Sequence, residues 1–156
     1  MEKLTLYRPA LGDLAWRETW LNDPDTMSYN HAYGGTIPFP RERWADWYAR
    51  WVGDGGARFF RYLRLEDSGE FVGNVAYYYD EEFAGHLCEV LIAAQHRGRG
   101  FGRQGLALLC EAARTNGVNR LLDNIATDNP AVTMFLRGGF RERERTDGFI
   151  LVEKEL

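Results

Sequence analysis

The residues whose types and spacing are best suited to chemistry lie at 95–102 and read Gln-His-Arg-Gly-Arg-Gly-Phe-Gly. An apolar run at 87–92 precedes them, and an amphipathic helical pattern follows. Glycines at 98, 100 and 102 lack a Cβ, so a ligand can approach the main chain closely. The first turn of a helix also offers N–H groups without an intrahelical partner, and together with the helix dipole they favour negative charge. This strand, loop and helix therefore predict a site for an anionic diphosphate.

Arg97, Arg99 and Arg103 add positive charge around the same turn. Two common phosphate motifs do not fit the segment. No Lys-Ser or Lys-Thr follows the glycines, which excludes the phosphate loop of nucleoside triphosphatases. The Gly-x-Gly-x-Gly spacing differs from the dinucleotide fingerprint and lies past the middle of the chain.

Gln95-x-x-Gly98-x-Gly100 resembles the acetyl-CoA pyrophosphate motif of the GCN5-related N-acetyltransferases (GNAT), Gln/Arg-x-x-Gly-x-Gly/Ala. The resemblance implies acetyl-CoA as the co-substrate, with no metal. It also implies a set of cofactor-binding residues in and around the loop. These are Leu91, Ile92, Ala94, Arg97, Gly98, Arg99, Gly100, Phe101, Gly102, Arg103, Asn129 and Phe135.

Residues 128–140 resemble a second block of this family, Asn-x-x-Ala-x-x-Leu-Tyr-x-x-x-Gly-Phe. Ala131 matches the block, as does its terminal Gly-Phe. In strict register the family's Asn falls on Asp128, with Asn129 one position late, so contact with the cofactor arm is assigned to Asn129. The family's Tyr, often the acid that reprotonates the leaving thiolate, falls on Phe135, which has no proton to give. Phe135 can still pack against the pantetheine arm.

Hydrophobic periodicity predicts the elements that hold these residues. Strands are expected at 4–7, 59–65, 71–79, 87–92, 121–126, 140–145 and 149–153. Helices are expected at 10–21, 41–51, about 99–116, and from 129–130 to 138–139, with mostly loop at 27–40. This is a mixed α/β pattern, expected to form one domain over 1–156. Its order resembles the GNAT fold, which implies a largely antiparallel sheet of about six to seven strands, splayed at the cofactor site and flanked by about four helices.

In such a splayed sheet, the strand at 87–92 would pair with the pantetheine arm as with an added strand. Amides near Leu91 and Ile92 would polarise the thioester. Direct acetyl transfer to an amine is expected, because both cysteines lie in apolar patterns without an assured activator. Glu89, a charge within an apolar strand, is the candidate general base; the alternative is that it lies on a solvated face. His86 is the rival base.

The acceptor pocket is expected around the aromatic segment that contains Tyr29 and Tyr33. Tyr78 must face opposite to its two tyrosine neighbours on the strand, and one of these faces can supply the missing hydroxyl acid. Trp44 and Trp47 are at helical spacing and are interpreted as core packing.

Bulk composition narrows the function classes. The net charge of −4 argues against nucleic acid as a partner. No apolar run approaches the ~20 residues that cross a bilayer, and no signal-peptide core is present, so a cytoplasmic protein without a membrane partner is expected. The partner implied is a small-molecule or peptide amine, with a homodimer as a candidate assembly. Two alternatives remain: an acyl-CoA sensor or pseudo-enzyme of the same fold, and a structural protein that uses its five Trp for contacts.

Overall fold

The computed structural model describes residues 2–53 and 57–156, apart from the side chains at 32 and 33. Its centre is a seven-stranded sheet in the order β1-β2-β3-β4-β5-β7-β6. The strands are β1 (Leu4–Tyr7), β2 (Arg58–Leu65), β3 (Phe71–Asp80), β4 (Gly85–Ile92), β5 (Arg120–Ala126), β6 (Arg141–Arg145) and β7 (Phe149–Glu155). Among the described strands, β4 pairs with β5 in parallel and the other five pairings are antiparallel. The mixed α/β class and the largely antiparallel sheet predicted from the sequence are confirmed.

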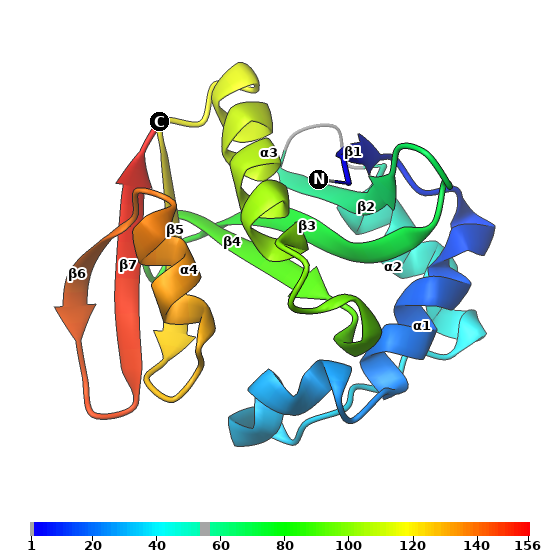
Figure 1. Ribbon diagram of the computed structural model, residues 1–156, viewed down its shortest axis with the longest axis horizontal. Helices are drawn as coiled ribbons and strands as arrows, with labels where there is room; N and C mark the ends of the chain where they lie inside the picture. The colour runs from blue at the N-terminus through cyan, green and yellow to red at the C-terminus, as the bar shows by residue number, and fades with distance from the viewer. Residues whose placement is uncertain (1, 54–56) are drawn as a thin grey trace.

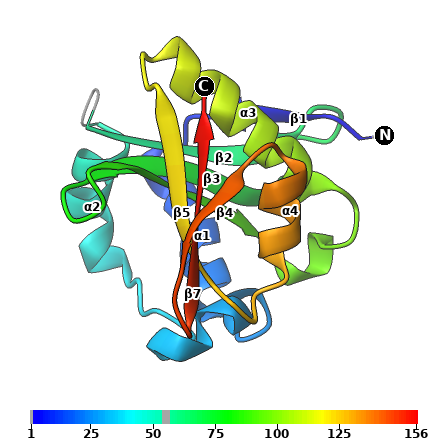
Figure 2. The ribbon, with the colours of Figure 1, turned by 90° about the vertical axis from the view of Figure 1, so that its left-hand side faces the viewer.

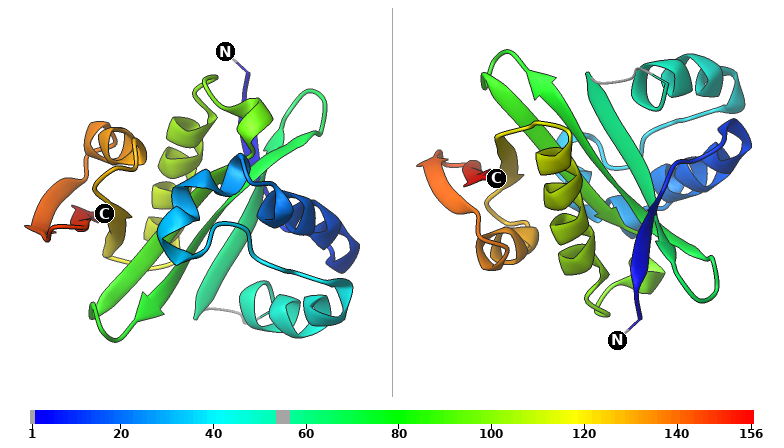
Figure 3. Two further views of the ribbon diagram at one scale, coloured as in Figure 1. Left: turned by 90° about the horizontal axis from the view of Figure 1, so that it is seen from below. Right: turned by 90° about the horizontal axis from the view of Figure 1, so that it is seen from above.

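Each face of the sheet has its own apolar core, because side chains alternate along a strand. On β3, Val75 and Tyr77 join the core under α3 (Phe101–Thr115). Ala76, between them, joins the core under α1 (Leu14–Asn22) and α2 (Trp44–Trp51). Figures 1 and 3 show α3 on one face of the sheet and α1 and α2 on the other. The predicted inversion of Tyr78 relative to Tyr77 and Tyr79 follows from the same alternation.

The fourth α-helix, α4 (Ala131–Arg137), packs beside α3 against β6 and β7. Short 3-10 turns complete the helical set: η1 (Leu11–Asp13), η2 (Thr26–Tyr33), η3 (Arg41–Arg43) and η4 (Ala94–His96). The predicted helices are confirmed with small shifts at their ends. None of the helices within the described ranges has the length and apolarity needed to cross a membrane.

The prediction that 27–40 is mostly loop is wrong for its first part, which is the 3-10 segment η2. Asp23 stabilises the start of this segment, because its carboxylate accepts hydrogen bonds from Thr26 Oγ1 (2.6 Å) and Thr26 N (3.4 Å). Met27 is buried in the α1 and α2 core, and Gly34, with a φ of 99°, ends the turns. Tertiary burial thus outweighs the turn-rich composition.

β4 and β5 are joined at only two register positions, His86 with Leu121 and Leu87 with Leu122. Beyond these positions the two strands diverge (Figure 1). Figure 2 shows β5 and β7 crossing the direction of β2 and β3, so the sheet turns sharply at this join. Residues 88–92 of β4 therefore have no strand partner on the β5 side.

Candidate functional site

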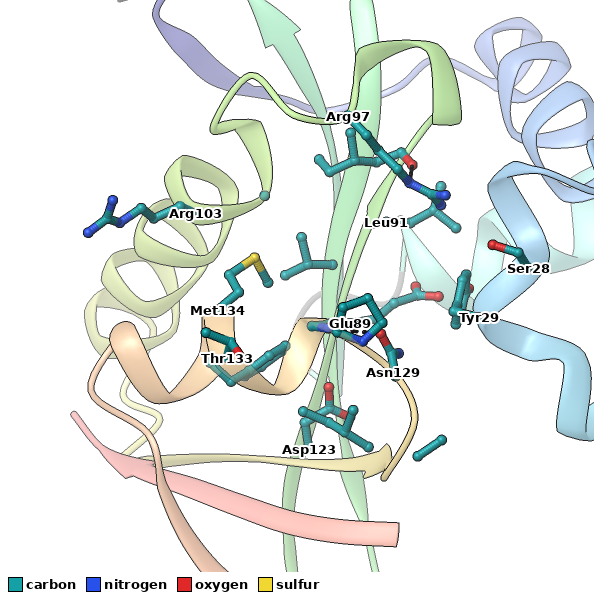
Figure 4. A pocket seen from close by; sticks show the side chains of 18 of the residues that line it. Ser28, Tyr29, Glu89, Leu91, Arg97, Arg103, Asp123, Asn129, Thr133 and Met134 are labelled. Carbon is teal, nitrogen blue, oxygen red and sulfur yellow. Dashed lines mark hydrogen bonds between the residues drawn. The ribbon is translucent and has the colours of Figure 1, made fainter. Parts of the chain in front are cut away.

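A cavity of about 840 Å³ lies where β4 and β5 diverge. Its lining comes from η2, β4, the loop that opens α3, β5, and the loop and helix of α4 (Figure 4). Every glycine of the predicted diphosphate loop lines it. The volume lies within the range of small-molecule sites, roughly 300–1,000 Å³.

The three loop glycines are needed for different reasons. Gly98 and Gly100 have φ values of 79° and 81°, a left-handed backbone that favours glycine. A Cβ on Gly102 would lie 2.8 Å from Met134 Sδ, so this glycine allows α3 to pack closely on α4. Gly98 and Gly100 therefore allow the backbone to turn, and Gly102 allows α3 to pack against α4.

Six consecutive backbone N–H groups, from residue 98 to residue 103, have no acceptor within the described ranges. The first satisfied donor of α3 is Gln104 N, which bonds Gly100 O at 3.2 Å. No side chain caps the helix at Gly100. Such a row of free donors at a helix start fits a diphosphate.

The predicted arginines differ in what they contact. Arg97 lines the cavity, but its guanidinium donates to Ile92 O (3.2 Å), Asp25 O (3.0 Å) and Thr26 O (2.6 Å), which ties η2 to the end of β4. Arg99 pairs with Glu2 and does not line the cavity. Arg103 lines the cavity without an ion-pair partner among the described residues, so its charge is available to an anion.

The remaining cofactor candidates mostly lie at the cavity. Leu91, Ile92, Phe101, Asn129 and Phe135 line it.

Ala94, also predicted to bind the cofactor, does not line the cavity, and its N–H donates to Thr26 Oγ1 at 2.9 Å. The Oδ1 of Asn129 accepts from Ala131 N at 2.9 Å and so holds the start of α4.

A second cavity, of about 510 Å³, adjoins the first. The two share Cys88, Glu89, Asp123 and Asn124 in their linings. The second cavity also has aromatic walls, which come from Trp47, Trp51, Phe60, Tyr78 and Phe83. A ligand in either cavity would meet Glu89 and Asp123.

The predicted acceptor residues fall on both sides of this junction. Tyr29 lines the first cavity and Tyr78 the second, whereas the side chain of Tyr33 is outside the described residues. Trp44 is buried and donates to Phe39 O at 3.1 Å, as its packing interpretation requires. Trp47 packs in the same core but also lines the second cavity.

Glu89 is half-buried at the junction and is not on a solvated face. Its Oε2 accepts a hydrogen bond from the Nδ2 of Asn74, a fully buried side chain on β3, at 3.3 Å. Figure 4 shows its carboxylate pointing toward Tyr29. The rival base, His86, lies beside the Tyr77 and Tyr79 rings (5.7 and 5.3 Å) and lines neither cavity.

Asp123 was not among the predicted site residues. Burial, with a smaller contribution from the Glu89 charge, raises the pKa of its carboxyl to about 8. The group is therefore mostly protonated at neutral pH. The available signal was the one used for Glu89: an acidic residue within an apolar strand. The second residue missed is Arg17 of α1, which lines the second cavity.

Comparisons with known proteins agree with this geometry. The model of the acetyltransferase (GNAT) family matches residues 16–140. No curated protein matched the chain.

Similar solved structures share the fold at low identity. A spermidine N-acetyltransferase from Vibrio cholerae, in complex with CoA and spermine, has 20% identity and a TM-score of 0.76, over 97% of this chain and 95% of that one. A GNAT-family acetyltransferase from Bacillus anthracis has 12% identity and a TM-score of 0.77, over 100% and 98%. A domain from Methanocaldococcus jannaschii has 17% identity and a TM-score of 0.79, over 100% of both chains.

Proposed function

The chain belongs to the acetyltransferase (GNAT) family, and we propose that it transfers an acetyl group directly from acetyl-CoA to a primary amine of a small molecule or peptide. The observation that carries this proposal is the row of six amides at 98–103, which have no acceptor in the part of the chain that the structure describes and lie, apart from that of Arg99, at residues that line the first cavity. Those amides and Arg103 would hold the diphosphate of acetyl-CoA. The unpaired edge of β4 at 88–92 would hold the pantetheine arm, because an open strand edge pairs with an extended amide chain.

The acetyl thioester would then lie at the junction of the two cavities, with the amine entering from the second. Glu89 would take a proton from the incoming ammonium, directly or through a water. The amine nitrogen attacks the carbonyl carbon, the C–S bond breaks, and the nitrogen gives up its second proton to water, which leaves a neutral amide and a thiolate. The leaving thiolate needs a proton, and Asp123, whose raised pKa keeps it protonated at neutral pH, is the acid that lines the same cavity.

Cys88 also lines the junction, yet burial raises the pKa of its thiol well above the ordinary value. A buried, protonated thiol is a poor nucleophile. This supports direct transfer over a route through an acetylated cysteine.

The second candidate is an acyl-CoA sensor of the same fold, favoured by Phe135 at the position of the family's Tyr. A thiol-release assay across a panel of amines, combined with calorimetry of acetyl-CoA binding, separates the two. An acetyltransferase binds acetyl-CoA and releases thiol with at least one amine. A sensor binds it and releases none, and a chain that binds no acetyl-CoA contradicts both.

The variant Gly100→Val tests the loop itself. It should weaken acetyl-CoA binding by roughly tenfold or more, because valine strains a backbone at positive φ and moves the amides. Gly69→Val is the matched control, since Gly69 has a φ of 77° and does not line the cavity. Equal acetyl-CoA affinity in both folded variants would contradict the assignment of the diphosphate to this loop.

A further inference from the structure

The second cavity contains a half-buried cation, Arg17, that has no ion-pair partner among the residues that the structure describes. Arg17 reaches this cavity from α1, and its guanidinium carbon lies 4.4 Å from the ring centroid of Trp47 and 5.4 Å from those of Phe39 and Phe60. Its Nε is buried and has no hydrogen-bond partner. Within the described ranges the guanidinium forms no hydrogen bond or ion pair at all.

The guanidinium of Arg17 has lost hydration in this position, which costs free energy unless an anion binds to it. Burial lowers the pKa of Arg17, but a guanidinium stays protonated in proteins. Aromatic faces compensate only part of the lost hydration. Glu89 favours the charged form of Arg17 from across the cavity, but the two side chains do not form an ion pair.

The cavity thus presents charges of both signs. Asp80 and Glu89 supply carboxylates, and Arg17 supplies a planar fork of donors. A planar guanidinium binds a carboxylate through two parallel hydrogen bonds, which makes a carboxylate its best-matched partner. The apolar lining at Trp51, Phe83 and Leu87 leaves a surface for a hydrophobic group.

Resting on the proposed acetyl transfer, we propose that the acceptor is a small amino carboxylate with an apolar side chain, and that Arg17 binds its carboxylate. The ammonium group faces Glu89 at the junction with the first cavity. The apolar side chain packs against the aromatic wall. A polyamine would instead bring a second cation toward Arg17, so this pocket selects against the acceptor type seen in the Vibrio cholerae structure.

The test compares acceptors that differ only in the carboxylate. Phenylalanine, phenylalaninamide, phenethylamine and spermidine are offered with acetyl-CoA, and thiol release gives kcat/KM for each. In parallel, calorimetry measures the binding of phenylalanine and phenethylamine to the CoA-loaded protein. Wild type should bind and acetylate phenylalanine best.

Arg17→Met keeps the stem over Trp47 and removes the charge. It should lower kcat/KM and affinity for phenylalanine by roughly a hundredfold, as expected for loss of a buried charge partner, and leave phenethylamine within about threefold. Arg17→Lys keeps the charge but loses the planar set of donors, so its kcat/KM for phenylalanine should lie between those of wild type and Arg17→Met. Arg41→Met is the matched control, because Arg41 also lies over a tryptophan (5.4 Å from Trp44) but lines neither cavity.

CoA affinity reports whether each variant is folded; if Arg17→Met fails this check, Arg17→Lys decides. Equal losses for phenylalanine and phenethylamine, or a wild type that prefers spermidine, overturn the inference and leave acetyl transfer standing. Binding of phenylalanine that depends on Arg17, without thiol release from any acceptor, supports the recognition by Arg17 and overturns the proposed acetyl transfer.

Discussion

At the residue scale, two carboxyl groups near one another at the junction have different surroundings. Asn74 donates a hydrogen bond to Glu89 (3.3 Å), which suits an ionised carboxylate. Asp123 is half-buried at the same junction, and desolvation raises its pKa to about 8. A carboxyl that stays protonated at neutral pH, as Asp123 does, suits the role of the acid beside the candidate base Glu89.

Glu89→Gln should lower kcat by about a hundredfold or more, because the amide occupies the same space but cannot accept the amine proton. The affinity for acetyl-CoA should stay close to that of wild type, since the diphosphate loop is unchanged. Steady-state kinetics with the best acceptor measure the effect. Glu111→Gln, on the exposed face of α3, is the control. A kcat within about threefold of wild type would remove Glu89 from the mechanism.

Asp123 predicts a pH dependence of stability. Its pKa rises from 3.8 to about 8 on folding, so the folded chain holds this proton more tightly than the unfolded chain. The contribution is fully present below pH 4 and is lost as the pH rises toward 8. Asp123→Asn, which stays neutral, should therefore gain in free energy of unfolding relative to wild type between pH 4 and pH 8, by roughly 1 kcal/mol or more.

Urea denaturation of both proteins at several pH values measures this difference. Asp147→Asn, in the exposed turn between β6 and β7, controls for removing any carboxylate. A difference between Asp123→Asn and wild type that does not change with pH would show that Asp123 titrates alike in both states.

At the scale of elements, the pairing of β3 with β4 sets the position of the cofactor edge. Gly73 lies opposite Ile92 in the register, and a Cβ built on it would overlap the carbonyl oxygen of Leu91. Only glycine therefore allows β4 to lie this close to β3 at the residues that would hold the pantetheine arm.

Gly73→Ala should lower the free energy of unfolding by about 2–3 kcal/mol, because a main-chain oxygen cannot rotate away as a side chain can. It should also weaken CoA binding, since β4 must move. Gly12→Ala is the matched control, as its Cβ would meet nothing within 4 Å, and it should stay within about 0.5 kcal/mol of wild type. Denaturation measures the stability and calorimetry measures CoA binding. Equal stability of the two variants would show that β4 can move away from the added methyl group without loss of free energy.

The elements were largely predictable because their signals are local. Alternation predicted β1, the turn residues at 66–70 predicted the hairpin of β2 and β3, helical spacing predicted α3, and the glycine pattern predicted the loop between β4 and α3. What was missed depends on contacts distant in sequence. Arg17 and Asp123 meet in one cavity only after the sheet has formed. The turns of η2 depend on Met27 being buried, which composition does not show.

At the scale of the whole molecule, the sheet has two parts, β1 to β4 and β5 to β7, which meet at the short pairing of β4 with β5. β4 and β5 share two register positions, and the main core continues across them through α3, β5 and β7. The diphosphate loop and β4 border the first cavity on one side, and β5 and α4 border it on the other. A ligand in this cavity would therefore contact both parts of the sheet.

Binding of CoA should consequently stabilise both sides together. At about a hundred times its Kd, a ligand adds about 2.7 kcal/mol to the free energy of unfolding, which a thermal melt detects. Amide hydrogen exchange should slow at 88–92 on β4 and also in α4, because the ligand links segments that otherwise open separately. In the Gly100→Val variant both effects should be smaller at the same CoA concentration, since a tenfold weaker affinity removes about 1.3 kcal/mol of the stabilisation. Slower exchange at 98–103 alone would mean that CoA binds only through its diphosphate, and that the pantetheine arm does not enter the space between β4 and β5.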